Sequence, residues 1–168
     1  TEGLLQFGNE WGAVPDWSPD GRYLAVPELM LAGEAFVVHL LRLDLEGGAV
    51  LDISGEEAMV QDMAPAWSPG GGWIALGRQW LDEERWTPGR QIWLTRPDGN
   101  EAYPLLVEAM ADHFALRWRP DGAVLAYVRQ DLSEGLQPVP DVALWIFDLV
   151  AREAVLVAED AVRPAWLP

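Results

Sequence analysis

The chain has 168 residues, half of them hydrophobic, which is enough to bury a folded core and argues against a disordered chain. Its 11 Lys and Arg stand against 27 Asp and Glu, and the net charge of −16 repels phosphate backbones and anionic lipid surfaces, so no nucleic-acid partner is expected. The absence of cysteine excludes disulfides, thiolate chemistry and cysteine-bound zinc. No apolar run approaches the roughly 18 residues of a membrane span, so we expect no membrane insertion, and residues 1–10 lack the pattern of a signal peptide.

The first predicted element is a strand at residues 4–7, which reads as the last strand of a preceding repeat. A complete unit follows. Its first strand, residues 14–18, ends in Trp17-Ser-Pro-Asp-Gly, where Pro presets φ and Gly accepts a positive φ, so the chain reverses into a second strand at residues 23–26. A strongly apolar third strand at residues 40–44 and a fourth at residues 50–53 complete the unit.

The same unit occurs twice more and then begins a fourth time. The four motif tryptophans are spaced 50, 51 and 48 residues apart, a period that suits a four-stranded repeat. The residues that define the repeat are Trp17, Pro19, Asp20 and Gly21 in the first copy, Trp67, Pro69 and Gly71 in the second, Trp118, Pro120, Asp121 and Gly122 in the third, and Trp166 in the truncated fourth.

The second and third units contain the same four strands in the same order. They are predicted at residues 65–68, 73–76, 92–96 and 103–107, and at residues 115–118, 124–128, 144–148 and 154–157. Gly and Pro interrupt the chain about every ten residues, so helical interpretations fit poorly. The one stretch with a helical pattern, residues 29–41, is rejected as a helix because its third-strand counterparts in the other units are short and bounded.

The Pro-x-Trp-Ser-Pro-Asp-Gly motif followed by a Leu-Ala strand resembles the TolB-type, WD-like β-propeller repeat, over nearly the whole chain. The resemblance implies an all-β fold with three complete four-stranded antiparallel blades and partial blades at both ends. Gly70 replaces Asp in the second copy and Arg119 replaces Ser in the third, which weakens single turns without breaking the pattern. Because TolB-like propellers are typically periplasmic, the resemblance also implies a bacterial, extracytoplasmic setting.

The expected array forms one domain, divided into residues 1–13 (last strand of a preceding blade), 14–61, 62–113 and 114–161 (the three blades), and 162–168 (first strand of a following blade). Closed propellers have about four to eight blades, and an open array would expose sheet edges and an apolar face. Two interpretations remain: the natural chain continues beyond Pro168, which we favour, or a second copy closes the ring as a homodimer.

Recognition is expected at the rim formed by the longer connections, because the opposite rim consists of tight turns. The connection at residues 78–90 holds Trp80, Arg85 and Trp86, and aromatic residues with an interleaved arginine have the composition of a binding anchor. Covering the edge of their own blade is the alternative role. The other tryptophans recur at fixed repeat positions and are assigned to packing between blades.

Six variable connections form this rim, at residues 27–35, 54–64, 78–90, 108–113, 129–141 and 158–163. They carry 15 of the 27 acidic residues, which predicts a negative recognition face and a protein partner with a basic surface. Acidic loops that serve only solubility are the alternative. None has the Asp-x-Asp-x-Asp-Gly spacing of a calcium site, and no metal or cofactor is expected. Asp112 and His113 precede an inner strand, and both are candidates to line the mouth of a central channel.

Catalytic patterns are absent from the sequence: no serine lies in a Gly-x-Ser-x-Gly elbow, and no phosphate-binding glycine loop or His-Glu-x-x-His helix occurs. We therefore predict a non-enzymatic protein-binding scaffold of the TolB-like type. The alternative is an accessory or gating propeller domain of a larger serine peptidase or other hydrolase. A purely structural piece, designed or excised, is the third interpretation, although Gly70, Arg119 and Leu167 break the motif differently in each copy, unlike an idealised design.

Overall fold

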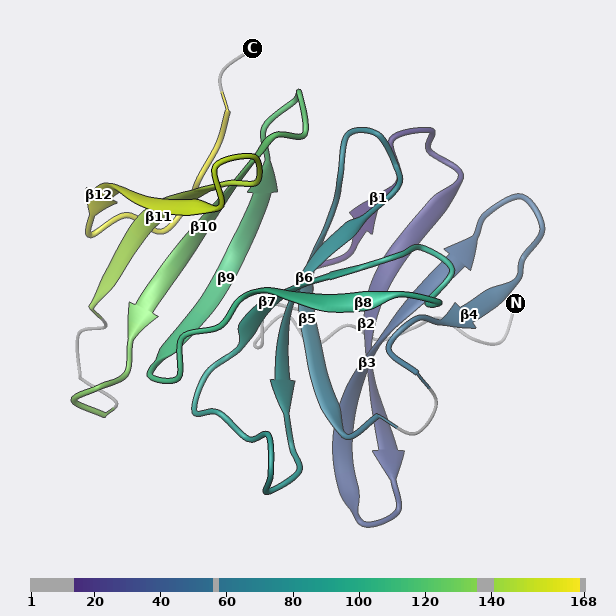
Figure 1. Cartoon of the computed structure of the whole chain (residues 1–168). Helices are drawn as coiled ribbons and strands as arrows, with labels where there is room; N and C mark the ends of the chain where they lie inside the picture. The colour runs from purple at the N-terminus through teal and green to yellow at the C-terminus, as the bar shows by residue number, and fades with distance from the viewer. Residues whose placement is uncertain (1–13, 56–57, 136–140, 167–168) are drawn as a thin grey trace.

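The computed structural model describes residues 14–55, 58–135 and 141–166, so the strand predicted at residues 4–7 lies outside the described residues. In these ranges the regular structure consists of strands (Figure 1), and no helix there is long and apolar enough to cross a membrane. The strands are β1 (Asp16–Trp17), β2 (Tyr23–Ala32), β3 (Ala35–Asp44), β4 (Val50–Asp52), β5 (Val60–Trp67), β6 (Ile74–Trp80), β7 (Gln91–Thr95), β8 (Ala102–Leu106), β9 (Ala111–Trp118), β10 (Val124–Asp131), β11 (Val142–Asp148) and β12 (Glu153–Glu159).

The strands form three four-stranded blades, in each of which every strand pairs antiparallel with the next one along the chain. The blades are β1–β4, β5–β8 and β9–β12, and a single parallel bridge between Val38 and Gln61 joins the first two. The predicted all-β fold of antiparallel four-stranded units is therefore confirmed. The predicted boundaries after residues 61 and 113 fall within β5 and β9.

The turn predicted from the repeat motif closes the first two strands of each blade. In the first blade, the amide of Gly21 donates to the Ser18 carbonyl at 2.9 Å, and the φ of Gly21 is 72°, a conformation that favours glycine. The Ser18 hydroxyl donates to the Asp20 carboxylate at 2.5 Å. In the third blade, where Arg119 replaces serine, the amide of Gly122 still donates to the residue 119 carbonyl at 2.8 Å. The turn therefore tolerates the departure from the motif.

Two of the repeated tryptophans donate a hydrogen bond to the blade before them. The indole N–H of Trp118 donates to the Ala66 carbonyl at 2.9 Å, and that of Trp166 donates to the Arg117 carbonyl at 3.2 Å. In both cases the acceptor directly precedes the tryptophan of the preceding blade. Trp67 stands at the same repeat position, but its indole nitrogen is buried and has no partner among the described residues.

The hydrophobic core lies between blades. One cluster packs the first blade against the second and the other packs the second against the third, which is how sheets with two apolar faces bury them. The first consists of Ala25, Leu40, Ile53, Trp67, Ile74 and Leu76, and the second of Ala66, Ala75, Ile92, Leu94, Leu116, Leu125, Tyr127 and Phe147.

Two inner strands, β5 and β9, are longer than predicted because each contains a β-bulge. The register of β5 against β6 shifts between Met63 and Ala66, and that of β9 against β10 shifts at the same repeat position. Ala64 and Ala115 lie in these bulges with φ of 52° and 54°. A bulge inserts one extra residue into the strand and so breaks the alternation of apolar and polar positions. Asp62 was predicted to lie in the connection at residues 54–64, whereas in the structure it lies in β5.

A second difference concerns residues 27–35, which were expected to form a variable connection. They continue the antiparallel pairing of β2 with β3 to Ala32 and Ala35, so the first blade ends in a long hairpin that projects at the bottom of Figure 1. The turn at Gly33 has a φ of 63° and needs only two residues.

Candidate functional site

A pocket of about 660 Å³ lies where the inner strands β1, β5 and β9 face one another. Residues at the late ends of β6 and β10 and in the connection from β6 to β7 complete it, so it lies toward the rim of the longer connections. The residues that line it are Val14, Pro15, Asp16, Gln61, Met63, Ala64, Pro65, Gln79, Pro88, Gly89, Arg90, Asp112, Phe114, Ala115, Arg117, Gln130 and Leu132.

Two blades contribute matching pairs of polar residues to this pocket. Gln61 on β5 lies opposite Gln79 on β6, and Asp112 on β9 lies opposite Gln130 on β10. Each pair occupies the same repeat positions, and opposite residues of an antiparallel pair project from the same face. Among the described residues, the carboxamides of Gln61 and Gln130 make no hydrogen bond with another protein group. The pocket therefore offers amide groups that can donate and accept hydrogen bonds.

Arg90 and Asp112 form a two-pronged ion pair in the pocket wall. The guanidinium Nε and Nη2 lie 2.8 and 2.6 Å from the two carboxylate oxygens, and the backbone amide of Arg90 donates to the same carboxylate at 2.7 Å. Both side chains are mostly buried, at 21% and 16% exposure. This arrangement links the second blade to the third and fixes both charges in position.

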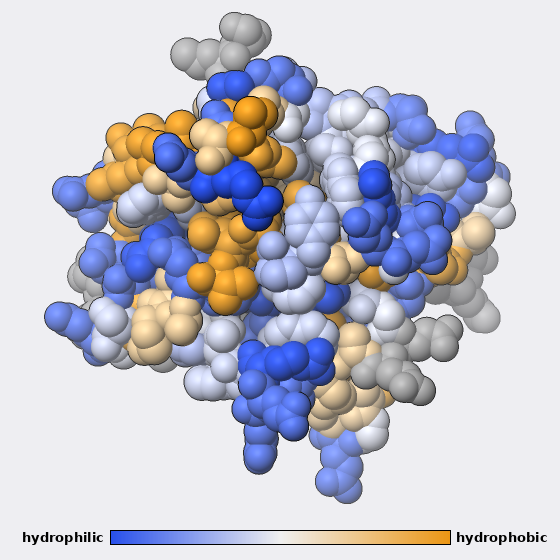
Figure 2. Space-filling view, in the orientation of Figure 1, coloured by the Kyte–Doolittle hydropathy of each residue, from blue (hydrophilic) through white to orange (hydrophobic). Residues whose placement is uncertain are grey.

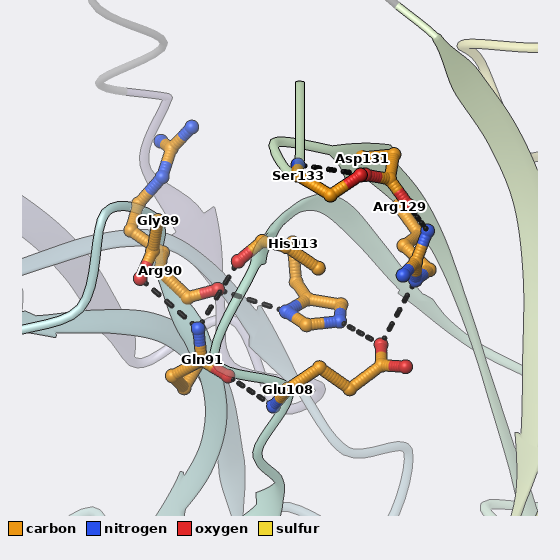
Figure 3. A network of polar contacts seen from close by, with 9 residues as sticks. Gly89, Arg90, Gln91, Glu108, His113, Arg129, Asp131 and Ser133 are labelled. Carbon is orange, nitrogen blue, oxygen red and sulfur yellow. Dashed lines mark hydrogen bonds and ion pairs between the residues drawn. The ribbon is translucent and has the colours of Figure 1, made fainter. Parts of the chain in front are cut away.

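Behind this wall, His113 is fully buried and joins three segments of the chain (Figure 3). Its backbone amide and its Nδ1 both donate to the Arg90 carbonyl, at 3.0 and 2.8 Å. Its Nε2 lies 2.8 Å from Glu108, whose carboxylate also accepts from Arg129 at 3.1 Å. Arg129 contacts Asp131 as well, at 3.2 Å. His113 therefore holds the backbone of Arg90, and so the ion pair that faces the pocket.

The protonation of this network follows from its hydrogen bonds. The hydrogen bond from His113 holds the pKa of Glu108 below its ordinary value of 4.5 against the opposing effect of burial, and the charge of Arg129 acts in the same direction as His113. Both ring nitrogens of His113 lie within hydrogen-bond distance of an oxygen, Nδ1 of the Arg90 carbonyl and Nε2 of the Glu108 carboxylate. The adjacent Tyr127 ring centroid lies 5.6 Å from that of His113, and burial raises the pKa of the Tyr127 phenol.

Gln91 and Gly89 hold the β6–β7 connection against β9. The Gln91 side chain donates to the carbonyls of Gly89 and Ala111 at 3.0 and 3.1 Å and accepts from the amide of Glu108 at 2.6 Å. A Cβ atom on Gly89 would lie 2.5 Å from the Ala111 carbonyl oxygen, so only glycine fits at this position. The wall of the pocket is thus tightly packed.

In the second blade, Asp62 and Arg78 occupy the repeat positions of His113 and Arg129 and form a buried ion pair. The Nε and Nη2 atoms of Arg78 donate to the two oxygens of Asp62 at 2.7 and 2.5 Å, and the Ser54 hydroxyl donates to the same carboxylate at 2.5 Å. The Arg78 guanidinium lies over the rings of Trp80 and Trp93, 5.3 and 5.1 Å from their centroids. The buried charge is therefore both paired and covered by aromatic faces.

The proposed anchor residues Trp80, Arg85 and Trp86 lie outside the pocket lining, in or beside the β6–β7 connection. Arg85 lies over the Trp80 ring at 3.4 Å from its centroid and pairs with Asp82 at 2.5 Å. Trp80 is half-buried between this cation and its own blade, whereas Trp86 is 57% exposed. Of the two candidates near the inner strand, Asp112 lines the pocket, while His113 points away from it into the blade.

Arg78, Arg90 and Arg129 were not predicted from the sequence as parts of this site. One signal was present, since an Arg-Gln dipeptide occurs 11 and 12 residues after the motif tryptophan in both the second and third units. The arginine of each dipeptide lies opposite the buried residue of the inner strand, and the glutamine lies opposite the pocket-facing one. Within the described residues, no group of three or more metal-ligating side chains is clustered.

Comparison with known proteins supports the architecture. No family model matches the sequence. Solved structures that are similar include a protein assigned as TolB from Agrobacterium tumefaciens (TM-score 0.65, 22% identity, 85% of this chain and 47% of that chain) and a chain of the nidogen/laminin complex (TM-score 0.60, 13% identity, 87% and 47%). Oligogalacturonate lyase from Vibrio parahaemolyticus is also similar (TM-score 0.59, 17% identity, 87% and 36%).

The chain spans about half or less of the length of each of these structures. At identities below 25% the similarity concerns the fold, and the neighbours share four-stranded blades arranged around an axis. With its repeated antiparallel blades, its indole junctions and its inner strands grouped around a pocket, the chain has the β-propeller fold.

Proposed function

We propose that the chain is a non-enzymatic binding module that recognises a polypeptide partner at the pocket and the connections around it. The observation that carries this proposal is the pocket lining, which contains no Ser, Thr, Cys, His, Tyr or Lys among the described residues. Its carboxylates are engaged, Asp112 with Arg90 and Asp16 with the backbone amide of Trp67 at 2.7 Å. Fixed charges and free amides suit recognition better than proton or group transfer.

The charge of the surrounding rim supports a basic partner. Arg85 pairs with Asp82, Arg90 with Asp112, and Arg129 with Glu108 and Asp131. In contrast, the carboxylates of Glu83 and Glu84 have no ion pair among the described residues. The rim therefore carries uncompensated negative charge, which attracts Lys and Arg and disfavours nucleic acid. The proposal includes no cofactor or metal.

Selection from a random peptide display library on the immobilised chain tests this function. We expect enrichment of peptides rich in Lys or Arg together with apolar residues. Trp86→Ala should weaken the selected peptides several-fold, because exposed tryptophans commonly act as anchors. Trp17→Ala is the matched control, since Trp17 has the same 57% exposure on a different part of the array. Absence of any enrichment, or equal loss with both variants, would count against the proposal.

A second candidate is an accessory or gating propeller domain of a larger hydrolase. It is favoured by the similarity to puromycin hydrolase (TM-score 0.52, 18% identity), of which this chain matches only 21%. The test is the sequence of the full gene. A catalytic domain with a Gly-x-Ser-x-Gly elbow after Pro168 would support this candidate, whereas an open reading frame that ends within one or two further blades would support the first.

Placement and assembly form part of the proposal. The TolB-like similarity supports a bacterial, periplasmic location, to be tested by cell fractionation. For assembly, Figure 2 shows an apolar patch over the third blade, where Val155, Leu156 and Val157 are 43–52% exposed. Light scattering of the purified 18.6 kDa chain would distinguish a homodimer that closes the ring from a monomer that needs further blades.

A further inference from the structure

The hairpin at the end of the first blade extends beyond the blades that follow. In the second blade, pairing between the second and third strands ends at Arg78 and Gln91. The equivalent pair in the first blade is Glu28 with His39, and four more pairs follow it, to Ala32 and Ala35. Four residues of extended strand span roughly 13 Å. The hairpin therefore projects from the rim that carries the longer connections (Figure 1).

One face of this projection is apolar and exposed. Leu31 lies opposite Phe36 and Leu29 lies opposite Val38, so these side chains share a face of the hairpin. Leu29, Leu31 and Phe36 are 64%, 65% and 66% exposed. Large hydrophobic residues at this exposure, grouped on one element, mark an interaction surface more often than scattered ones do.

The projection is held in place from its other face. His39 is buried, with its Nδ1 2.6 Å from Asp52 and its Nε2 2.8 Å from the Ala58 carbonyl. Val37 is also buried, and Val38 forms the parallel bridge to Gln61 on β5. The apolar face is thus presented on a preorganised platform, which lowers the entropic cost of binding.

The surroundings of the apolar face are acidic. Glu34 lies in the turn of the hairpin, next to the apolar face, whereas Glu28 lies opposite His39 and projects from the other face. Neither carboxylate has an ion pair among the described residues. In Figure 2 the hairpin has hydrophobic colouring between hydrophilic groups, and the β6–β7 connection, with Glu83 and Glu84, projects from the same rim.

We propose that the exposed face of the β2–β3 hairpin docks a partner polypeptide whose apolar side chains are flanked by Lys or Arg. The apolar groups would cover Leu29, Leu31 and Phe36, and the cations would pair with Glu34 in the adjoining turn. A second copy of the chain fits less well because it brings a net charge of −16 to the same acidic surface, and an anionic lipid surface fits less well for the same reason. The proposal rests on the polypeptide-binding function above and names the surface and the chemistry of the partner.

The probe for the test is a fluorescein-labelled 13-residue peptide of alternating Leu and Lys, with a Leu–Glu peptide and a Ser–Lys peptide as comparisons. Fluorescence anisotropy should show binding of the Leu–Lys peptide in preference to both. The double variant L31S/F36S should weaken binding about tenfold or more. Glu34→Gln should weaken it about two- to fivefold and reduce its dependence on salt. The matched control V155S/V157S removes two residues of 51% and 52% exposure from the third blade and should leave the affinity unchanged.

Several results would overturn the proposal. One is equal binding of the Leu–Lys peptide to the L31S/F36S variant and the wild-type chain. Equal binding of the Leu–Glu peptide would remove the role of charge, and a doubled solution mass that L31S/F36S returns to 18.6 kDa would assign the face to a second copy. If L31S/F36S binds normally while Trp86→Ala does not, the hairpin assignment fails and the binding function stands. If the wild-type chain binds neither the probe nor any displayed peptide, both fail. Matching thermal melts of all variants exclude loss of folding.

Discussion

The indole nitrogen of Trp118 donates to the carbonyl of Ala66 at 2.9 Å, across the junction between the second and third blades. Trp166 forms the equivalent bond to Arg117 at 3.2 Å. The tryptophan of the motif therefore serves both as a packed residue of the junction and as a hydrogen-bond donor across it.

Replacing Trp118 with phenylalanine should destabilise the chain by about 1–3 kcal/mol, because it leaves the Ala66 carbonyl without its partner and removes part of a packed ring. Urea unfolding followed by circular dichroism measures the change. Trp17→Phe is the control, since Trp17 is 57% exposed, and a change below about 0.5 kcal/mol is expected there. Equal effects of the two substitutions would show that the hydrogen bond across the junction contributes little.

The Arg90–Asp112 pair should contribute to stability more than the exposed ion pairs do. Asp112→Asn should cost about 1–3 kcal/mol because it removes the charge from a partly buried, two-pronged contact. A double-mutant cycle with Arg90→Gln isolates the pair. The control cycle is Arg119–Asp121, whose side chains are 39% and 53% exposed and whose coupling should be below about 1 kcal/mol. Similar coupling in both cycles would contradict the prediction.

The chain should lose stability in acid as the Glu108 carboxylate becomes protonated. Its pKa is lower in the folded chain than its ordinary value of 4.5, so the folded state binds fewer protons there than the unfolded state does. The stabilisation is therefore complete above about pH 4.5 and is lost as the pH falls through the lowered folded pKa. Thermal melts between pH 2.5 and 7 should show a smaller loss at low pH for Glu108→Gln than for the wild-type chain. Glu101→Gln, at an exposed ion pair, should follow the wild-type profile.

Gly89→Ala should destabilise the chain by about 1–3 kcal/mol or more, because the new methyl group would lie 2.5 Å from the Ala111 carbonyl oxygen and 2.7 Å from the Cα of Asp112. Both contacts are with backbone, which can move only if β9 moves. Gly70→Ala is the control, since no atom lies within 4 Å of the added carbon and its φ is not in the left-handed region. If both substitutions were neutral in urea unfolding, the close approach of the connection to β9 would be refuted.

The blades were predictable because their signal is local. Trp, Pro and Gly in the motif dictate a turn whatever surrounds it, and three copies with one period fix the order of strands. The inner strands were predicted too short because the bulges at Ala64 and Ala115 interrupt the alternation that marks a strand. The hairpin at Gly33 was missed because apolar residues continue on both sides of its turn, so no change in pattern marks it.

The pocket was less predictable because it depends on contacts between blades. Asp112 lines it, but its partner Arg90 comes from a connection 22 residues away. His113 was grouped with Asp112 by sequence, yet neighbouring residues of a strand project from opposite faces, and His113 lies behind the pocket wall. Period-two alternation separates these two roles, and it becomes visible only when the full length of β9 is known.

The bulges at Ala64 and Ala115 also bear on how such an array can acquire new specificity. Each lies between the residues that approach the pocket, Gln61 and Asp112, and the motif tryptophan that holds the blades together. The pairing of the residues between the bulge and the tryptophan is set after the bulge. A residue before the bulge can therefore change from an amide to a carboxylate without shifting that pairing. A library confined to the residues before each bulge would therefore vary part of the pocket lining on an unchanged scaffold.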